Sequence, residues 1–176
     1  RSNQILICHG GSDPRQLTAR TLEALELTRD CYEIVVLAGA GLPDLNRVKS
    51  LVNDSKHNCK VIVGEREPSR WMRQAALAII NGGNIRYELC MTGTPFIAVS
   101  ITEKQVEFNH QITRYGVGSN LGLMDYVTDS QIANEVDCLM RNVILRQEMQ
   151  DKMIPLFDSD GAERILSVVS GNYGKI

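Results

Sequence analysis

Two glycine-rich segments of the sequence have the residue types that hold a phosphate group. The first reads HGGSDP and the second reads NGGN, and their candidate binding residues are Gly10, Gly11, Ser12, Gly82, Gly83 and Asn84. Glycine lets backbone N–H groups turn toward an anion and lets the anion approach closely. The N-terminus of a following helix adds the positive end of its dipole. Together the two segments could hold a diphosphate, with side-chain hydrogen bonds from Ser12 and Asn84.

Glu88 lies five residues after Gly83 and is the acidic residue of the second segment. Its carboxylate could accept hydrogen bonds from both hydroxyls of a ribose, as acidic residues do in dinucleotide sites. The alternative is a glutamate at the start of a helix, where the dipole favours a negative charge. A glycine pair after a strand is by itself more often a sharp turn, and neither segment matches a Walker A loop or GxGxxG. The occurrence of both segments favours a phosphate site, whereas both roles stay open for Glu88.

The remaining reactive residue types point to no metal chemistry. His9 is the candidate acid or base by type, with a buried structural histidine as an equal alternative. Trp71 could wall a base pocket, although a lone tryptophan belongs more often to a core. The histidines show no ligand spacing with one another or with cysteine, so we expect no metal and no cofactor. The cysteines are odd in number and form no CxxC pair, which indicates reduced thiols of a cytoplasmic protein: Cys8, Cys31, Cys59, Cys90 and Cys138.

Apolar runs alternate with amphipathic stretches along the chain. Buried strands are predicted at Gln4–Gly10, Tyr32–Gly39, Cys59–Gly64, Leu77–Asn81 and Pro95–Ile101, and a short edge strand at 117–122. Helices are predicted between them, the first capped by Ser12 or Asp13 with Pro14 in its first turn, the second opened by Pro43. A capping box from Thr128 to Gln131 starts a helix over 128–143, and a last helix covers 161–170. Uniformly apolar strands that alternate with helices predict an α/β fold, a doubly wound, mostly parallel Rossmann-like sheet with helices on both faces.

The topology then brings the two glycine segments together. Right-handed crossovers place every strand-to-helix loop at one edge of a parallel sheet. Ligands of such sheets bind at that carboxyl edge, near the point where the strand order reverses. We therefore expect one site that contains both segments.

Composition limits the classes of function that remain. The 176 residues suit a single domain, with 43% hydrophobic and 23% charged residues. The formal net charge of −2 gives no indication of nucleic acid binding. No apolar run approaches the roughly 18 residues of a membrane span. The sequence starts at Arg1 and enters a strand almost at once, so we expect a piece of a longer protein. The sequence does not determine the oligomeric state and is compatible with an oligomer.

Three stretches carry a resemblance to a known family: ILICHGGSDPRQLT, MRQAALAIINGGNIRYELCMTGTPFIAVSITEKQ and FDSDGAERI. Together they resemble the C-terminal half of GT-B nucleotide-sugar enzymes. They look most like the UDP-sugar hydrolases of the pseudaminic acid pathway and the related spore-coat polysaccharide biosynthesis proteins. The resemblance implies one nucleotide-binding domain over residues 1–176 that binds UDP or a UDP-sugar, with the N-terminal partner domain absent.

The resemblance also assigns roles to residues. Residues 10–12 would match the first diphosphate loop, residues 82–84 the second, and Glu88 the ribose-binding glutamate. The loop Gly64–Met72 would cradle uracil, largely through backbone groups. The family pattern has Asn-Gln where this chain has Lys104-Gln105, so Gln105 joins the nucleotide-binding residues.

Two departures bear on catalysis. The family's candidate base is a histidine in an N-terminal GxGHxxR loop, which this chain lacks, so His9 and Lys104 are left as catalytic candidates without a motif to support them. Ala76 stands where the family usually has aspartate. The leading hypothesis is the UDP-sugar-binding domain of a hydrolase or glycosyltransferase in cell-surface polysaccharide or nonulosonic acid biosynthesis, inactive in isolation. The alternative is a non-catalytic, degenerate GT-B half that serves as a partner-binding or regulatory module. A third possibility, a flavodoxin-like or response-regulator domain, is disfavoured because the acidic cluster that a response regulator needs at its strand ends is missing.

Overall fold

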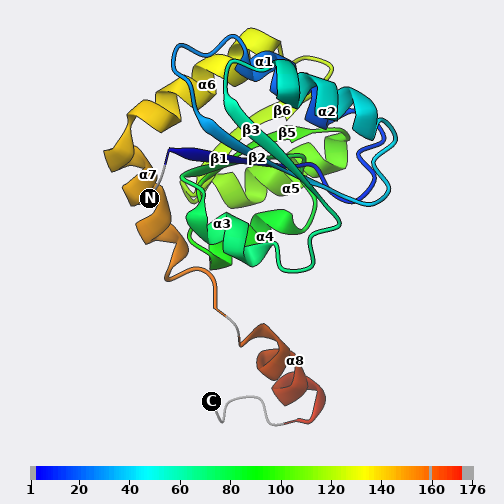
Figure 1. Cartoon of the computed structure of the whole chain (residues 1–176). Coiled ribbons are helices and arrows are strands. Elements are labelled where there is room, and N and C mark those ends of the chain that lie inside the picture. The colour runs from blue at the N-terminus through cyan, green and yellow to red at the C-terminus, as the bar shows by residue number, and fades with distance from the viewer. Residues whose placement is uncertain (1–2, 159, 172–176) are drawn as a thin grey trace.

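A six-stranded parallel sheet forms the centre of the computed structural model, which describes residues 3–158 and 160–171 (Figure 1). Its strands are β1 (Gln4–Cys8), β2 (Glu33–Ala38), β3 (Asn58–Val63), β4 (Leu77–Ile80), β5 (Phe96–Ser100) and β6 (Gly118–Leu123). The order across the sheet is β3-β2-β1-β4-β5-β6, and every neighbouring pair is parallel. The strand order reverses between β1 and β4, which makes this the switch point of a doubly wound sheet. The predicted fold class is confirmed.

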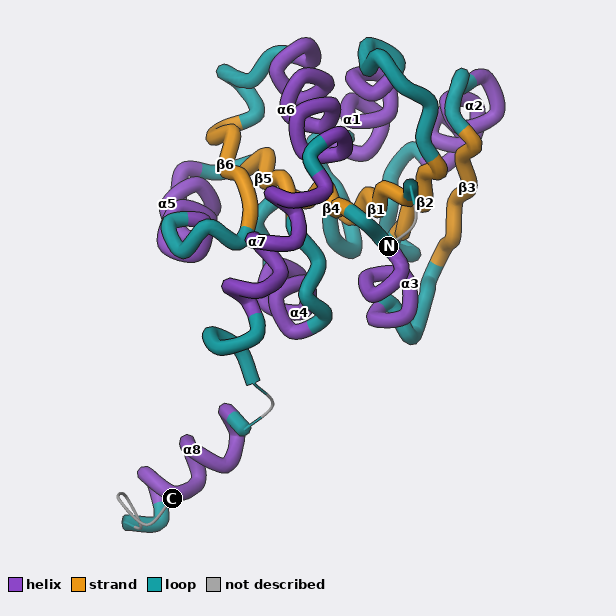
Figure 2. Tube along the Cα trace, turned by 90° about the vertical axis from the view of Figure 1, so that its left-hand side faces the viewer, coloured by secondary structure: helices purple, strands orange, loops and turns teal. Residues whose placement is uncertain are grey.

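Helices cover both faces of the sheet (Figure 2). α1, α2 and α6 lie over one face, and α3, α4 and α5 lie over the other. Their bounds, with those of two further helices, are α1 (Leu17–Leu25), α2 (Leu45–Asp54), α3 (Ser69–Gln74), α4 (Ile85–Met91), α5 (Glu103–Thr113), α6 (Asp129–Arg141), α7 (Val143–Met153) and α8 (Gly161–Val169).

The period-2 alternation of each strand divides the core into two layers. Ile5 and Ile7 of β1 pack in the cluster that includes α1, α2 and α6, whereas Leu6 packs in the cluster that includes α3, α4 and α5. All three side chains are fully buried. Because both faces are covered, the inner strands β1, β2, β4 and β5 are largely continuous apolar runs, which is the pattern that the sequence showed, whereas the edge strands β3 and β6 are only partly buried.

The first two helices begin later than predicted. α1 begins at Leu17, because the carboxylate of Asp13 accepts hydrogen bonds from the amides of Leu17 and Thr18, at 2.9 and 2.8 Å. Pro14 therefore lies in the preceding turn, outside the helix. α2 is capped by Asp44, whose side chain accepts from the amide of Arg47 at 3.0 Å. In both cases a carboxylate satisfies free N–H groups and sets the helix start.

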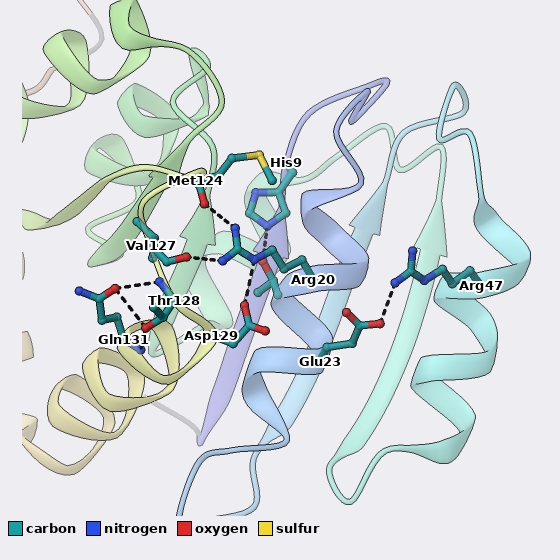
Figure 3. Close-up of polar contacts among 10 residues, drawn as sticks. His9, Arg20, Glu23, Arg47, Met124, Val127, Thr128, Asp129 and Gln131 are labelled. Carbon is teal, nitrogen blue, oxygen red and sulfur yellow. Dashed lines mark hydrogen bonds and ion pairs between the residues drawn. The ribbon is translucent and has the colours of Figure 1, made fainter.

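The helix predicted over 128–143 is confirmed in its start and corrected at its end. Thr128 and Gln131 form the expected capping box, which Figure 3 shows beside Asp129. At Asn142 the backbone leaves the helical region, and its side chain accepts from the amide of Leu145 at 2.9 Å. Asn142 therefore ends α6 and caps α7, a helix that was not predicted from the sequence.

The last helix, α8, differs from the others in its surroundings. None of its residues is buried, and it stands away from the sheet in both views of the chain (Figures 1 and 2). Within the described part of the chain, no helix has both the length and the apolar character that a membrane crossing requires.

Candidate functional site

A cavity of about 360 Å³ opens where β1, β2 and β4 end. β1 and β4 are adjacent and parallel, so the loops that follow them meet at the switch point of the sheet. The cavity is lined by these residues of the predicted site: Gly10, Gly11, Gly83, Asn84 and Glu88. The expectation that the two glycine segments share one edge is met by this geometry.

Three other predicted residues do not line this cavity. Ser12 is exposed next to it. Gly82 is buried with φ +146°, and a Cβ there would lie 2.7 Å from Asn109 Nδ2 and 2.8 Å from Gln105 Cβ. Gln105 accepts a hydrogen bond from the amide of Ile101 at 2.9 Å. Gly82 and Gln105 therefore pack the second glycine segment against α5, and their contact with a ligand stays a prediction.

Asn81, which was not among the predicted site residues, joins the two glycine segments. Its Oδ1 accepts from the amides of Gly82 and Gly83 at 2.8 and 3.1 Å. Its Nδ2 donates to the carbonyl of His9 at 2.7 Å. The amides of the glycine pair are thus already used inside the protein, so the expectation that they donate to an anion does not describe this conformation. An asparagine that bonds its own backbone one and two residues on is a known turn device, and this was the available signal.

Other amides at the same edge have no such partner. The N–H groups of Gly11, Ser12, Asn84 and Ile85 donate no hydrogen bond to any described residue. Asn84 precedes α4, and its side chain makes no capping hydrogen bond. Four amides are therefore available to an anion, two from the first segment, one from Asn84 of the second segment and one from Ile85 at the start of α4.

Gly39, at the end of β2, allows the first glycine segment to approach closely. A Cβ at Gly39 would lie 2.1 Å from the carbonyl oxygen of Gly11, closer than any side chain could come. Gly39 lines the cavity as well. Its signal in the sequence was a glycine directly after an apolar strand, which marks a close backbone approach.

Glu88 presents a free carboxylate to the cavity. The residue is exposed, and its carboxylate makes no hydrogen bond or ion pair with any of the residues described. Cys8 lines the same cavity; burial raises the pKa of its thiol, and the charge of Glu88 adds to this against a hydrogen bond from Gly10. Glu88 is thus close to the end of β1 and able to accept hydrogen bonds from a ligand.

The loop Gly64–Met72 is braced by a single carboxylate. Glu65 accepts hydrogen bonds from the amide of Glu67 (3.0 Å), from Trp71 Nε1 (2.7 Å) and from Arg70 (2.8 Å). These bonds, the one from Glu67 above all, lower the pKa of Glu65 to about 2. Trp71 does not line the cavity, so its place is in this brace and not in the wall of a base pocket.

His9 is buried beside α1, outside the cavity. Its Nε2 lies 2.9 Å from the hydroxyl of Thr21, and Figure 3 shows the ring between Met124 and Arg20. Burial lowers the pKa of His9 to about 4, although the charge of Asp13 acts in the opposite direction. The ring is therefore neutral near pH 7, and the geometry favours a structural role.

The two positions that depart from the family pattern lie in different places. Lys104 is exposed in the first turn of α5 and does not line the cavity. Ala76 is buried just before β4, and its amide donates to the carbonyl of Gln4 at 2.8 Å. Ala76 is therefore at the amino edge of the sheet, opposite the cavity. Across the described residues, no group of three or more His, Cys, Asp or Glu side chains could hold a metal ion.

The strand order, the two glycine segments and the cavity at the switch point define one Rossmann-like half of a GT-B fold. The sequence is 28% identical over 171 residues to the spore coat polysaccharide biosynthesis protein SpsG of Bacillus subtilis (strain 168). The matched region covers 96% of this chain and 50% of SpsG. The resemblance to the C-terminal half of GT-B enzymes is confirmed. No family model matches the chain.

Solved structures share this fold at low sequence identity. MurG of Acinetobacter baumannii matches with a TM-score of 0.80 and 17% identity, over 97% of this chain and 52% of MurG. The spinosyn rhamnosyltransferase SpnG, complexed with thymidine diphosphate, matches with a TM-score of 0.66 and 16% identity, over 94% of this chain and 45% of SpnG. The chain thus spans about half the length of the relatives that it matches.

Proposed function

We propose that this chain is the nucleotide-binding half of a GT-B-type enzyme and that UDP, or the UDP part of a UDP-sugar, occupies the cavity at the switch point. The observation that carries the proposal is that three residues with free backbone amides, Gly11, Asn84 and Ile85, line a single cavity together with the unpaired carboxylate of Glu88, and that the free amide of Ser12 is adjacent to it. Donors for a diphosphate and an acceptor for ribose hydroxyls are the two chemistries that a nucleoside diphosphate requires.

The diphosphate lies against the amides of Gly11, Ser12, Asn84 and Ile85. No lysine or arginine is among the described residues that line the cavity, so neutral N–H donors must recognise the charge. Backbone amides at a loop and at a helix start do this without a cation. This chemistry also needs no metal ion.

The ribose and the base occupy the rest of the cavity. The carboxylate of Glu88 accepts hydrogen bonds from the two ribose hydroxyls. Leu37, Pro68 and Met72 offer apolar surface to the base. The loop Gly64–Met72, which Glu65 braces, supplies backbone groups to the edge of the uracil. A pyrimidine nucleotide is supported by the thymidine diphosphate found with SpnG, a protein of the same fold.

The reaction of the whole enzyme is hydrolysis or transfer of a sugar in cell-surface polysaccharide or nonulosonic acid biosynthesis. The name of SpsG supports a polysaccharide pathway. Because the chain spans about half of such relatives, the other half of the enzyme supplies the attacking group. The alternative is a non-catalytic half that binds a partner, and it was based on the departures at Ala76 and Lys104. Because Ala76 lies opposite the cavity, only the departure at Lys104 still supports this alternative.

A calorimetric titration of the 176-residue chain with UDP tests the proposal. We expect saturable binding to one site, and we expect Glu88→Ala to weaken it by about tenfold, the loss that follows when a charged acceptor of two hydrogen bonds is removed. Glu107→Ala, which removes an exposed glutamate from α5, is the control and leaves the affinity unchanged. Absence of binding at millimolar UDP, or equal affinities for the Glu88→Ala variant and the wild type, would refute the site.

A further inference from the structure

Arg86 is a buried cation directly beneath the second glycine segment. Only 5% of its surface is exposed. One guanidinium nitrogen, Nη1, donates to the carbonyl of Gly82 and, at 2.9 Å, to the carbonyl of Gly83. Nη2 donates to the hydroxyl of Tyr87 at 3.2 Å, and Nε has no hydrogen-bond partner in the described structure.

The charge of Arg86 has no anionic partner among the described residues. The ion pairs of the described chain involve other arginines: Arg15, Arg20, Arg47, Arg70, Arg141 and Arg164. Its guanidinium is instead covered by two rings, at 4.5 Å from Tyr87 and 5.4 Å from Phe108. A buried charge without a counter-ion destabilises a protein, and low-dielectric surroundings strengthen its field. Such a group is retained at a stability cost, which indicates a role in function.

The geometry of the peptide unit connects Arg86 to the cavity. A trans peptide is planar, with its C=O and N–H groups on opposite sides. Because the carbonyl of Gly83 points to Arg86, the amide of Asn84 points away from it. That amide is one of the four free donors, and Asn84 lines the cavity. Arg86 thus fixes the orientation of this donor and adds positive potential behind it.

We propose that Arg86 is a positioning residue that makes the second glycine segment selective for a diphosphate over an uncharged nucleoside. It acts through the peptides of Gly82 and Gly83 and does not touch the ligand. The negative charge of the bound diphosphate is then the counter-ion that the described residues do not supply. This inference rests on the proposed function, because it concerns the ligand of the same cavity.

Affinities of the 176-residue chain for UDP and for uridine test the role of Arg86. Arg86→Met removes charge and hydrogen bonds, Arg86→Gln keeps an N–H donor without the charge, and Arg86→Lys keeps the charge. We expect Arg86→Met and Arg86→Gln to weaken UDP binding by about tenfold and uridine binding by less than about twofold. Arg86→Lys retains most of the UDP affinity. Circular dichroism establishes that each variant is folded, and Arg86→Gln provides the test if Arg86→Met does not fold.

Arg114→Met is the matched control. Arg114 stacks on Tyr115 at 5.0 Å and donates to its hydroxyl at 3.0 Å, as Arg86 does with Tyr87, but it binds no glycine carbonyl. We expect it to change neither affinity. Equal losses of affinity for UDP and uridine in Arg86→Gln, or no loss for either ligand, would overturn the role of Arg86 but not the proposed function. Absence of UDP binding by the wild-type chain would overturn the proposed function, and this inference with it.

Discussion

His9 shows at the residue scale how burial decides what a reactive side chain can do. Its exposed fraction is 2%, and its Nε2 is held by Thr21. Desolvation disfavours the charged imidazolium, so the ring takes up a proton only under acid conditions. The same histidine that residue type suggests as an acid or base is thereby linked to the stability of the fold.

The pKa of His9 predicts a dependence of stability on pH. Unfolded His9 binds a proton below its ordinary pKa of 6.5, whereas folded His9 stays neutral down to about pH 4. Its contribution to the free energy of unfolding is therefore complete above pH 6.5 and falls as the pH drops toward 4, by on the order of 3 kcal/mol. Urea unfolding at several pH values measures this.

A pair of variants isolates the contribution of His9. His9→Gln removes the titrating group and should flatten the part of the pH dependence between 6.5 and 4. His110→Gln, which changes an exposed histidine of α5, should show the same dependence of stability on pH as the wild type. An identical acid loss of stability in His9→Gln and wild type would show that other groups cause it.

At the residue scale, some residues of the site could be predicted from the sequence and others could not. The glycine segments and Glu88 were found because their types and their positions after apolar runs carry a signal. Asn81 and Arg86 were not, since their importance comes from the carbonyls that they contact: His9, 72 residues before Asn81, and the glycine pair beside Arg86. Residue type alone does not reveal such contacts.

At the scale of elements, the ends of β1 and β2 must pack closely for the cavity to exist. Gly39 makes this contact with the carbonyl of Gly11, where a Cβ would lie at 2.1 Å. We predict that Gly39→Ala displaces the first glycine segment, destabilises the fold by about 1–3 kcal/mol and weakens UDP binding. Thermal unfolding measures the loss of stability, and calorimetric titration with UDP measures the loss of affinity.

Gly161→Ala is the control for the Gly39 variant. A Cβ at Gly161 meets its nearest heavy atom at 3.8 Å, and α8 lies away from the cavity. This variant should change neither stability nor affinity appreciably. If Gly39→Ala behaved in the same way, the close approach of the two loops would not matter to the site.

The packing of α1 on the β6–α6 connection depends on Arg20 (Figure 3). Arg20 donates to the carbonyls of Met124 and Val127 and to Asp129, the last at 2.9 Å. Arg20→Ala leaves these acceptors without their donor, so we expect a loss of about 2 kcal/mol in the free energy of unfolding. Chemical denaturation measures it.

Arg47, drawn in the same figure, provides the comparison. It pairs with Glu23 at 2.8 Å, but both side chains are more than 40% exposed. Exposed ion pairs contribute little, so Arg47→Ala should lose about 0.5 kcal/mol or less. Equal losses for the two variants would contradict the structural role given to Arg20.

The whole molecule was the most predictable scale, because the signals that fix it are repeated. Each inner strand is a largely apolar run that is followed by a helical stretch, so the parallel sheet could be predicted. What escaped was local: a cap at Asp44, and the break at Asn142 that creates α7. One side-chain hydrogen bond decides each of these, and many residues offer such bonds.

At this scale, the length of the chain bears on its activity. The chain spans about half of SpsG, MurG and SpnG. We predict that the 176 residues alone bind UDP but do not release it from UDP-N-acetylglucosamine at a rate above the buffer background. A coupled assay for UDP release measures this. Release well above background by the isolated chain would show that it carries its own attacking group.

The central claim is that UDP binds at the switch point between β1 and β4, and amide chemical shifts of the 15N-labelled chain test it most directly. We predict that UDP perturbs the amides of Gly11, Ser12, Asn84 and Ile85 most strongly, together with those of the loop Gly64–Met72. The amides of α8 should not respond. Shifts that cluster away from these loops, or no saturable shifts at millimolar UDP, would contradict the account.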